Sequence, residues 1–547
     1  MTDMTAETPT TTPAGALPSA LDEWRNLLGD DSVVTQDEPL DAAARATFAT
    51  SSRPSAILLP STVDDVAACL RVATRWAVPI YPVSRGKNWG YGSRAAHRDC
   101  SVILDMSRLN KVRDFDEELG HITVEPGVTQ DDVLDFLERR GSHRMLSHPG
   151  SLGSISLLGN LLERGFGVFT GGPYEDRARY STNFEVVTAT GTQFSTGIGK
   201  YGPSSIAALD DWGVGPQLNG LFLQSNLGVV TAATLWLAHR PRFPQHIAVN
   251  LDEGDLPQLI DALRTVRQAN PNHRFYLINR VGLAARTRPY PRRTQDRGRA
   301  LLDDEELTEL TGLAREWTCI GLLHAETRRQ RRAELDLVKS ALGRLRRQGH
   351  YPNTDRARIL RRLWWPLKML TGTDVRQALD AFYDHSTVRP FDTSTAVNQL
   401  FWRKRTSAPT NPDPDRDGCG LIWFLPMIPW RARDITSVVG TCRNVMTNAG
   451  FEPTIALRFP ADRTVLVACS IQFDRDEPGA DDRAMDCYEA LFAAVADLGY
   501  LPYRAGLQGM AMYPSPEPGW QDVFARLKSA LDPNGVIAPG RYDHTIN

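Results

Sequence analysis

The sequence contains none of the short signatures that identify the commonest hydrolases and metal sites. HExxH and GxSxG are both absent, which removes the usual zinc-protease and serine-hydrolase patterns. The seven cysteines, at positions 69, 100, 319, 419, 442, 469 and 487, include no CxxC pair. An odd and scattered set is typical of reduced thiols, so we expect a cytoplasmic protein without a disulfide framework or a zinc site.

A basic surplus and a long apolar run are missing as well. Lys and Arg number 62 against 65 Asp and Glu, a net charge of −3, which argues against nucleic acid as a partner. No apolar run approaches the roughly eighteen residues of a membrane-spanning helix. Residues 1–20 lack the basic and apolar regions of a signal peptide and are rich in Thr, Pro and Ala, so they are predicted to form a disordered tail.

The 547 residues are too many for one core and predict two or more domains. Strands and helices alternate throughout, and we find no internal repeat. Strands are predicted at 56–60, 78–83, 101–106, 121–126, 183–189, 229–237, 275–281, 319–323, 420–428 and 465–473. Helices are predicted at 62–77, 304–317, 331–349 and, before the stop signal DPNG, from residue 520.

The stretch SRGKNWGYG, residues 84–92, follows the predicted strand at 78–83 and has the composition of an anion-binding loop. It is not a P-loop, because GKN lacks both the GxxxxGK[ST] spacing and the hydroxyl that holds magnesium. Gly90, Gly92 and Ala95 satisfy GxGxxA, yet too few residues remain before the strand at 101 for a crossover helix. Two interpretations stay open, a plain glycine-rich hairpin and a nest of backbone N–H groups around a pyrophosphate.

Other segments, in order along the chain, give this loop a context. They are LLPSTVDDVAACLRVA, SVILDMSRLNKV, HITVEPGVTQDDV, GSISLLGNLLERGFGV, NFEVVTATG, GLFLQSNLGVVTAATLWL, FWRKR and LKSALDPNGVIAPGR. Together with the loop they resemble the vanillyl-alcohol oxidase/p-cresol methylhydroxylase family of FAD-linked oxidoreductases. The resemblance covers nearly the whole chain after the tail.

The resemblance implies an FAD cofactor and the residues that hold it. The pyrophosphate cradle would be Ser84, Arg85, Gly86, Lys87 and Asn88, with Gly90 beside it. The remaining contacts along the cofactor would be Ser156, Gly159, Asn160, Gly165, Gly167, Glu185, Val186 and Arg541.

The resemblance also implies an α+β fold. Two α+β subdomains at 21–243, completed by a returning segment at 500–547, would form the FAD-binding domain of the p-cresol methylhydroxylase type. Residues 244–499 would form an α+β cap that covers the flavin ring and shapes the substrate pocket.

Family members hold a para-substituted phenol as a phenolate between two tyrosines and an arginine, which correspond to Tyr91, Tyr503 and Arg504. These residue types suit the task, because a guanidinium and two phenolic O–H donors stabilise an anionic oxygen. A deprotonated phenol pushes electrons toward the para carbon, so that hydride can leave for flavin N5 and a quinone methide remains.

Three departures from the family pattern are visible. The acidic residue expected beside flavin N5 is replaced by Ser151, which cannot act as a carboxylate base, and His148 is one candidate substitute. A further family tyrosine aligns with Val168. The His or Tyr that carries the flavin in covalent members aligns with Leu421 or Ile422, so we predict non-covalent FAD, with Cys419 an inert buried thiol rather than a link.

These features predict an FAD-dependent oxidase or dehydrogenase that removes hydride from the benzylic or allylic carbon of a para-hydroxylated aromatic, by alcohol oxidation or desaturation. The departures suggest a specialised pathway intermediate as the substrate. The alternatives are a cytochrome-coupled 4-alkylphenol dehydrogenase and a non-redox protein with a repurposed pocket. The electron acceptor would be O2 or a protein, and a homodimer is the default assembly.

Overall fold

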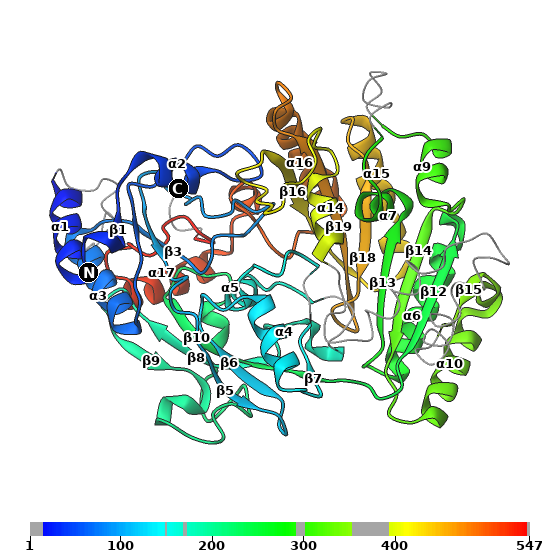
Figure 1. Ribbon diagram of the computed structural model, residues 1–547, viewed down its shortest axis with the longest axis horizontal. Helices are drawn as coiled ribbons and strands as arrows, with labels where there is room; N and C mark the ends of the chain where they lie inside the picture. Colours follow the sequence, from blue (N-terminus) through cyan, green and yellow to red (C-terminus); the bar gives the residue numbers. More distant parts are fainter. Residues whose placement is uncertain (1–14, 148–149, 168–171, 292–300, 353–392, 544–547) are drawn as a thin grey trace.

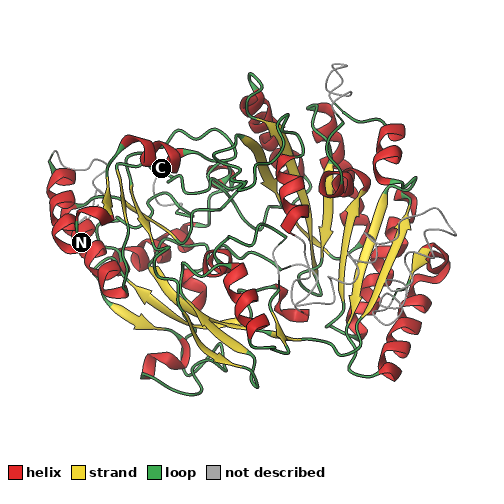
Figure 2. Cartoon of the chain, in the orientation of Figure 1, coloured by secondary structure: helices red, strands yellow, loops and turns green. Residues whose placement is uncertain are grey.

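The computed structural model describes residues 15–147, 150–167, 172–291, 301–352 and 393–543 of the chain. Two sheets and a two-stranded pair are built from residues before 240, and one larger sheet is built from residues 245–474 (Figures 1 and 2). No helix in these ranges is long and apolar enough to cross a lipid bilayer.

The first sheet is mostly parallel and carries the glycine-rich loop. Its strands, in spatial order, are β1 (Val33–Val34), β2 (Ala56–Leu58), β4 (Val102–Asp105) and β3 (Ile80–Val83). Helix α3 (Val63–Trp76) begins at a Thr62–Asp65 capping box and connects β2 to β3. The chain then passes from β3 to its parallel neighbour β4 through residues 84–101, which contain no helix.

The second sheet is antiparallel and packs its buried face on a separate core. Its order is β5 (Val112–Asp116), β6 (His121–Val124), β10 (Val229–Trp236), β8 (Ser181–Val187) and β9 (Gln193–Ser195). The remaining elements of this part of the chain are α1 (Ala16–Leu28), α2 (Asp37–Ala44), α4 (Gln130–Arg139), α5 (Leu157–Leu162) and the pair β7 (Arg144–Met145) and β11 (Ala238–His239).

The third sheet is antiparallel and forms one wall of the site. Its order is β15 (Gly349–His350), β12 (Gln245–Leu251), β14 (Trp317–Leu323), β13 (Arg274–Asn279), β18 (Thr454–Arg458), β19 (Thr464–Asp474) and β16 (Cys419–Phe424), with β17 (Met427–Pro429) on β19. One face packs on α6 (Leu256–Ala269), α10 (Arg328–Leu342), α15 (Ala432–Asn448) and α16 (Ala480–Asp497). The other face carries α7 (Arg280–Thr287), α9 (Asp304–Thr311) and α14 (Thr393–Phe401).

Alternation along β13 assigns neighbouring residues to opposite faces of this sheet. Phe275 and Leu277 point into the large helix-covered core, whereas Tyr276 and Ile278 join a separate apolar cluster that includes Tyr91. The second face of the sheet is therefore the one that meets the glycine-rich loop.

The chain returns to the first sheet at its C-terminal end. After α17 (Pro518–Leu531), the Ile80 N–H donates to the carbonyl of Val536 at 2.8 Å and the Ala538 N–H donates to the carbonyl of Ile80 at 2.8 Å. The last described residues thus lie beside the start of the loop at 84–92. In Figure 1 the red C-terminal segment runs among the blue N-terminal elements.

The structure differs from the sequence prediction at several element boundaries. The predicted strand at 275–281 ends at Asn279, where α7 begins, and the predicted strand at 420–428 is divided into β16 and β17. Three further differences concern helices. Helix α1 begins at Ala16, inside the predicted tail of residues 1–20, because Ala16, Ala20 and Trp24 form a buried stripe with a spacing of four. The predicted helices 304–317 and 331–349 end early, at Thr311 and Leu342. Each is followed by a glycine with positive φ, Gly312 at 67° and Gly343 at 55°, and such a residue ends a helix.

Candidate functional site

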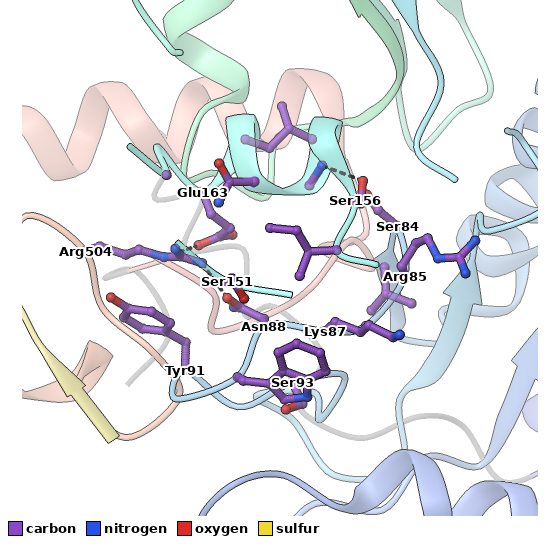
Figure 3. A pocket seen from close by; sticks show the side chains of 18 of the residues that line it. Ser84, Arg85, Lys87, Asn88, Tyr91, Ser93, Ser151, Ser156, Glu163 and Arg504 are labelled. Atoms are coloured by element: carbon purple, nitrogen blue, oxygen red, sulfur yellow. Dashed lines mark hydrogen bonds and ion pairs between the residues drawn. The ribbon is translucent and has the colours of Figure 1, made fainter. Parts of the chain in front are cut away.

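A cavity of about 250 Å³ lies between the first two sheets and the third. Its lining comes from the loop at 82–93, from the segment around α5, from β16 and from residues near the C-terminus. Figure 3 shows side chains of the loop, of the segment around α5 and of Arg504 around one space. Segments more than four hundred residues apart in the sequence therefore share one pocket.

The loop residues Ser84, Arg85, Gly86, Lys87 and Asn88 all line this pocket. Gly86 has φ of 64°, and a Cβ there would lie 2.6 Å from Arg94 Nε, so the turn requires glycine. Lys87 Nζ donates to Ser154 Oγ at 2.9 Å, and burial lowers the Lys87 pKa. This arrangement suits a buried anion.

Helix α5 approaches the loop closely. Ser156 caps the helix by accepting from the Gly159 N–H at 2.9 Å, and a Cβ at Gly159 would lie 3.1 Å from Ser84 Oγ. Ser156, Gly159, Asn160 and Gly165 all line the pocket. Buried Arg177 holds Asn160 by donating to its Oδ1.

Tyr91, Tyr503 and Arg504 come together at one end of the pocket. The Arg504 guanidinium carbon lies 4.0 Å from the centroid of the Tyr91 ring, a cation–π contact, and its Nη2 donates to Asn88 Oδ1. Burial raises the pKa of Tyr91, so its hydroxyl stays protonated. This end of the pocket offers a permanent cation and a phenolic donor.

Glu163 is the only acidic side chain among the described residues that line the pocket. Its Oε2 lies 3.3 Å from Arg504 Nε, and its Oε1 pairs with Arg541 Nη2 (Figure 3 shows the Arg504 pair). Glu163 therefore joins the two arginines as a shared counter-ion. Sequence reasoning missed it, although it stands in LERGFG directly before residues that were assigned.

Ser151 lines the pocket, so no carboxylate occupies that position. Glu163 is held by two guanidinium groups, which leaves it poorly suited to accept a proton. His148 and Val168 lie outside the described residues.

Four predicted cofactor residues are absent from the described lining. Gly90 lies behind it, where a Cβ would meet Trp423 Cδ1 at 2.3 Å, and at Gly167 a Cβ would meet Ser147 Oγ. Glu185 pairs with Arg113 at 3.0 Å across the second sheet, and Val186 is buried in that sheet's core. The alternation of β8 turns Val186 into this core, and Gly228, Val229 and Val230 line the pocket from neighbouring β10 and the turn before it.

Strand β16 supplies the opposite wall. Leu421 and Trp423 line the pocket, whereas Ile422 points into the helix-covered core. Burial raises the pKa of the Cys419 thiol to about 12, which keeps it protonated and unreactive. Thr47 fixes the wall to the loop, because its hydroxyl accepts from the Gly90 N–H and donates to the Leu421 carbonyl.

Asp415 holds the far side of the loop. Its carboxylate accepts from Trp89 Nε1 at 3.1 Å and from Ser93 Oγ at 2.7 Å. Burial, with a smaller contribution from the charge of Asp413, raises the Asp415 pKa to about 7. The folded protein therefore keeps this proton at pH values at which the unfolded chain has released it.

We expect Asp415 to make the protein less stable as pH rises from about 4 to about 7, the window between its unfolded and folded pKa values. Asp415→Asn should match the wild type near pH 4 and lose less unfolding free energy between pH 4 and pH 8. Urea unfolding at both pH values measures this. An equal loss in the two proteins would show that Asp415 ionises freely in the folded state.

Known proteins are similar to this chain over nearly its whole length. Residues 54–197 match a family model described as FAD binding domain. The chain is 37% identical to 1'-carboxy-chondrochloren decarboxylase of Chondromyces crocatus, over 96% of this chain and 97% of that protein. It is 26% identical to the 4-cresol dehydrogenase [hydroxylating] flavoprotein subunit of Pseudomonas putida, over 97% and 96%.

Solved structures match the whole fold. Substrate-bound p-cresol methylhydroxylase superposes with a TM-score of 0.84 at 25% identity, covering 98% of each chain. The 4-ethylphenol oxidase of Gulosibacter chungangensis gives the same TM-score and coverage at 22% identity. The cradle in which glycines keep α5 and the loop close suits a bound FAD. The chain belongs to the p-cresol methylhydroxylase-type family of FAD-dependent oxidoreductases.

Proposed function

We propose that the protein removes hydride from the benzylic or allylic carbon of a para-hydroxylated aromatic compound. The observation that carries this proposal is the meeting of Tyr91, Tyr503 and Arg504 in the pocket that the loop at 84–88 also lines. A cation beside phenolic hydroxyls is the chemistry that stabilises a phenolate.

The chain's own residues account for substrate activation. Arg504 holds the phenolate oxygen by charge, and protonated Tyr91 donates a hydrogen bond to it. The phenolate then pushes electrons toward the para position and weakens the benzylic C–H bond. Bound FAD supplies the two-electron acceptor for this hydride.

Ser151 favours reactions that need no carboxylate base. Alcohol oxidation and desaturation fit, because the quinone methide can lose a proton from its own hydroxyl or neighbouring carbon without activation of water. Hydroxylation by water is less favoured, since Glu163 is the only acid in the described lining and is paired with two arginines.

A second candidate, oxidative decarboxylation, is favoured by the relative from Chondromyces crocatus, whose name is that of a decarboxylase. After hydride loss, a quinone methide with a carboxylate on the adjacent carbon can expel CO2. The electrons of the broken C–C bond form the new C=C bond, and the ring becomes a phenolate again. This route also needs no carboxylate base.

We further propose that FAD is bound without a covalent link, because Leu421 faces the pocket and Cys419 is protonated. Acid precipitation of the yellow protein should release intact FAD into the supernatant. Colour retained in the pellet would place a covalent bond on this chain.

Anaerobic mixing tests the reaction itself. We expect 4-ethylphenol or 4-hydroxybenzyl alcohol to bleach the flavin, whereas the 4-methoxy analogues, which cannot become phenolates, should not. A protein that binds FAD and is bleached by no phenol would support the non-redox alternative. Reoxidation in air then separates an oxidase from a dehydrogenase with a protein acceptor.

A homodimer remains the proposed assembly. Six large apolar side chains are exposed on the segment that joins β9 to β10 of the second sheet, and such a cluster is typical of a protein–protein contact. They are Tyr201, Ile206, Leu209, Trp212, Val214 and Leu218.

A further inference from the structure

A small second cavity adjoins the main pocket on the side of the third sheet. Gln399, Trp423 and Arg458 line both cavities. The small cavity lies over the face of the third sheet that points toward the site, and the end of α7 closes it. Its space is that of about one water molecule, so a larger group would reach it from the main pocket.

Two arginines face this cavity, Arg458 from β18 and Arg286 from α7. Their guanidinium carbons lie 5.9 Å and 5.5 Å from the centroid of the Tyr276 ring. The Nε atom of each is buried and has no hydrogen-bond partner among the described residues.

No acidic side chain is among the described residues that line the small cavity. Burial lowers the pKa of Arg286, and the positive charge of Arg458 lowers it further. Two cations thus lie close together without a nearby counter-ion in the lining, an arrangement that is costly unless an anion joins them.

Three other arginines of this region have carboxylate partners. Arg504 and Arg541 share Glu163, and Arg280, on the same helix as Arg286, pairs with Asp304. Arg85, in the lining of the main pocket, has no acidic partner among the described residues but donates to the Gly127 carbonyl at 3.3 Å. A planar guanidinium with unused N–H donors is well suited to bind a carboxylate.

We propose that Arg458 and Arg286 form a subsite for a carboxylate group of the aromatic substrate. The proposal rests on the proposed function, because it assigns a second recognition point to the same phenolic molecule. The aromatic ring lies in the main pocket, and the carboxylate lies where that pocket meets the small cavity, in contact with Arg458 and backed by Arg286. The subsite selects hydroxyaryl acids over neutral phenols.

Matched ligands test this selection on the wild-type holoenzyme. We would measure Kd from the concentration dependence of anaerobic flavin bleaching by 4-hydroxyphenylacetate and 3-(4-hydroxyphenyl)propanoate, each against its primary amide. Acid and amide have nearly the same shape and differ in charge. At least one acid should bind about 10- to 100-fold more tightly than its amide.

Variants of the two arginines test whether these residues cause the preference for the acid over its amide. Arg286→Gln and Arg458→Gln should each bring the acid-to-amide ratio of Kd values close to one. Arg288→Gln, at an exposed arginine just after the same helix, should keep the wild-type ratio. If Arg286 only supports the helix end, Arg286→Gln would lower Tm and leave the ratio unchanged, which would overturn the proposal.

The neutral probe 4-ethylphenol distinguishes failure of the carboxylate subsite from failure of the proposed function. If it bleaches the flavin while neither acid is preferred over its amide, the carboxylate subsite is wrong and the proposed function stands. If neither 4-ethylphenol nor any of the four other probes bleaches the flavin, the proposed function fails and the subsite fails with it.

Discussion

Replacing Arg504 with alanine is expected to lower kcat/KM for a 4-alkylphenol by about 100- to 1,000-fold, the usual cost of removing one charge-stabilising donor. Arg504 is 8% exposed and reaches Glu163, Asn88 and the Tyr91 ring at once. No water can replace its charge in so enclosed a place. The loss should appear in the rate of flavin reduction, measured by anaerobic stopped-flow mixing.

The pH profile distinguishes a lost phenolate partner from a damaged pocket. An opposite charge lowers the pKa of the bound phenol, so the alanine variant should need a higher pH to reach half of its maximal reduction rate. The deficit should shrink as pH rises. Arg526→Ala, at a surface arginine paired with Asp522, is the matched control and should behave as wild type. A uniform loss at every pH would mean that Arg504 positions neighbouring groups without contacting a phenolate.

Glu163 shows why the sequence alone could not complete this site. The family resemblance pointed to Arg504 and Arg541 separately, and both line the pocket. That one carboxylate pairs with both is a property of the folded chain, because α5 lies far in sequence from the C-terminal segment that carries the arginines. No local pattern encodes a contact of this separation.

Local features, in contrast, were predictable from the residues. The strand before the glycine-rich loop and the helix capped at Thr62 follow from alternation and capping chemistry, and the structure contains both as β3 and α3. The predictions at 304–317 and 331–349 were wrong at their C-terminal ends, because they continued each helix through a glycine, Gly312 or Gly343, that has positive φ in the structure.

Val186 was predicted to contact the cofactor but does not line the pocket, because the direction of its side chain could not be predicted from the sequence. Val186 lies on β8, one strand from the residues of β10 that line the pocket, and its alternation points it into the core instead. Arg458 and Trp423 were not assigned to the site, because their approach to the loop depends on how the third sheet packs on the first half of the chain. Such packing is set by long-range contacts that the sequence does not display.

Gly159→Val is expected to abolish stoichiometric FAD binding, raising Kd by about 100-fold or more, while the chain still folds. At this position a Cβ would already lie 3.1 Å from Ser84 Oγ and 3.3 Å from Ser156 Cβ. Valine adds two methyl groups, which must push α5 away from the proposed pyrophosphate cradle at 84–88. Well-packed interiors absorb such an insertion only by shifting backbone.

The measurements are the flavin-to-protein ratio after purification and a titration of the apoprotein with FAD, followed by fluorescence quenching. Gly440→Val is the matched control. Gly440 lies within α15, and its Cβ would meet nothing within 4 Å, so the control carries the same change of helix propensity without a clash. It should retain FAD fully.

The outcome decides whether the closeness of α5 to the loop serves the cofactor or only the packing. If Gly159→Val binds FAD as tightly as Gly440→Val, the cofactor does not depend on the 3.1 Å approach between residue 159 and Ser84, and the cradle at 84–88 would have to be assigned elsewhere along the pocket. If only Gly159→Val loses the flavin while both variants keep the same Tm as apoproteins, the clash acts on the cofactor and not on the fold. The glycine is then required because two backbone segments must stand close enough to enclose one pyrophosphate between them.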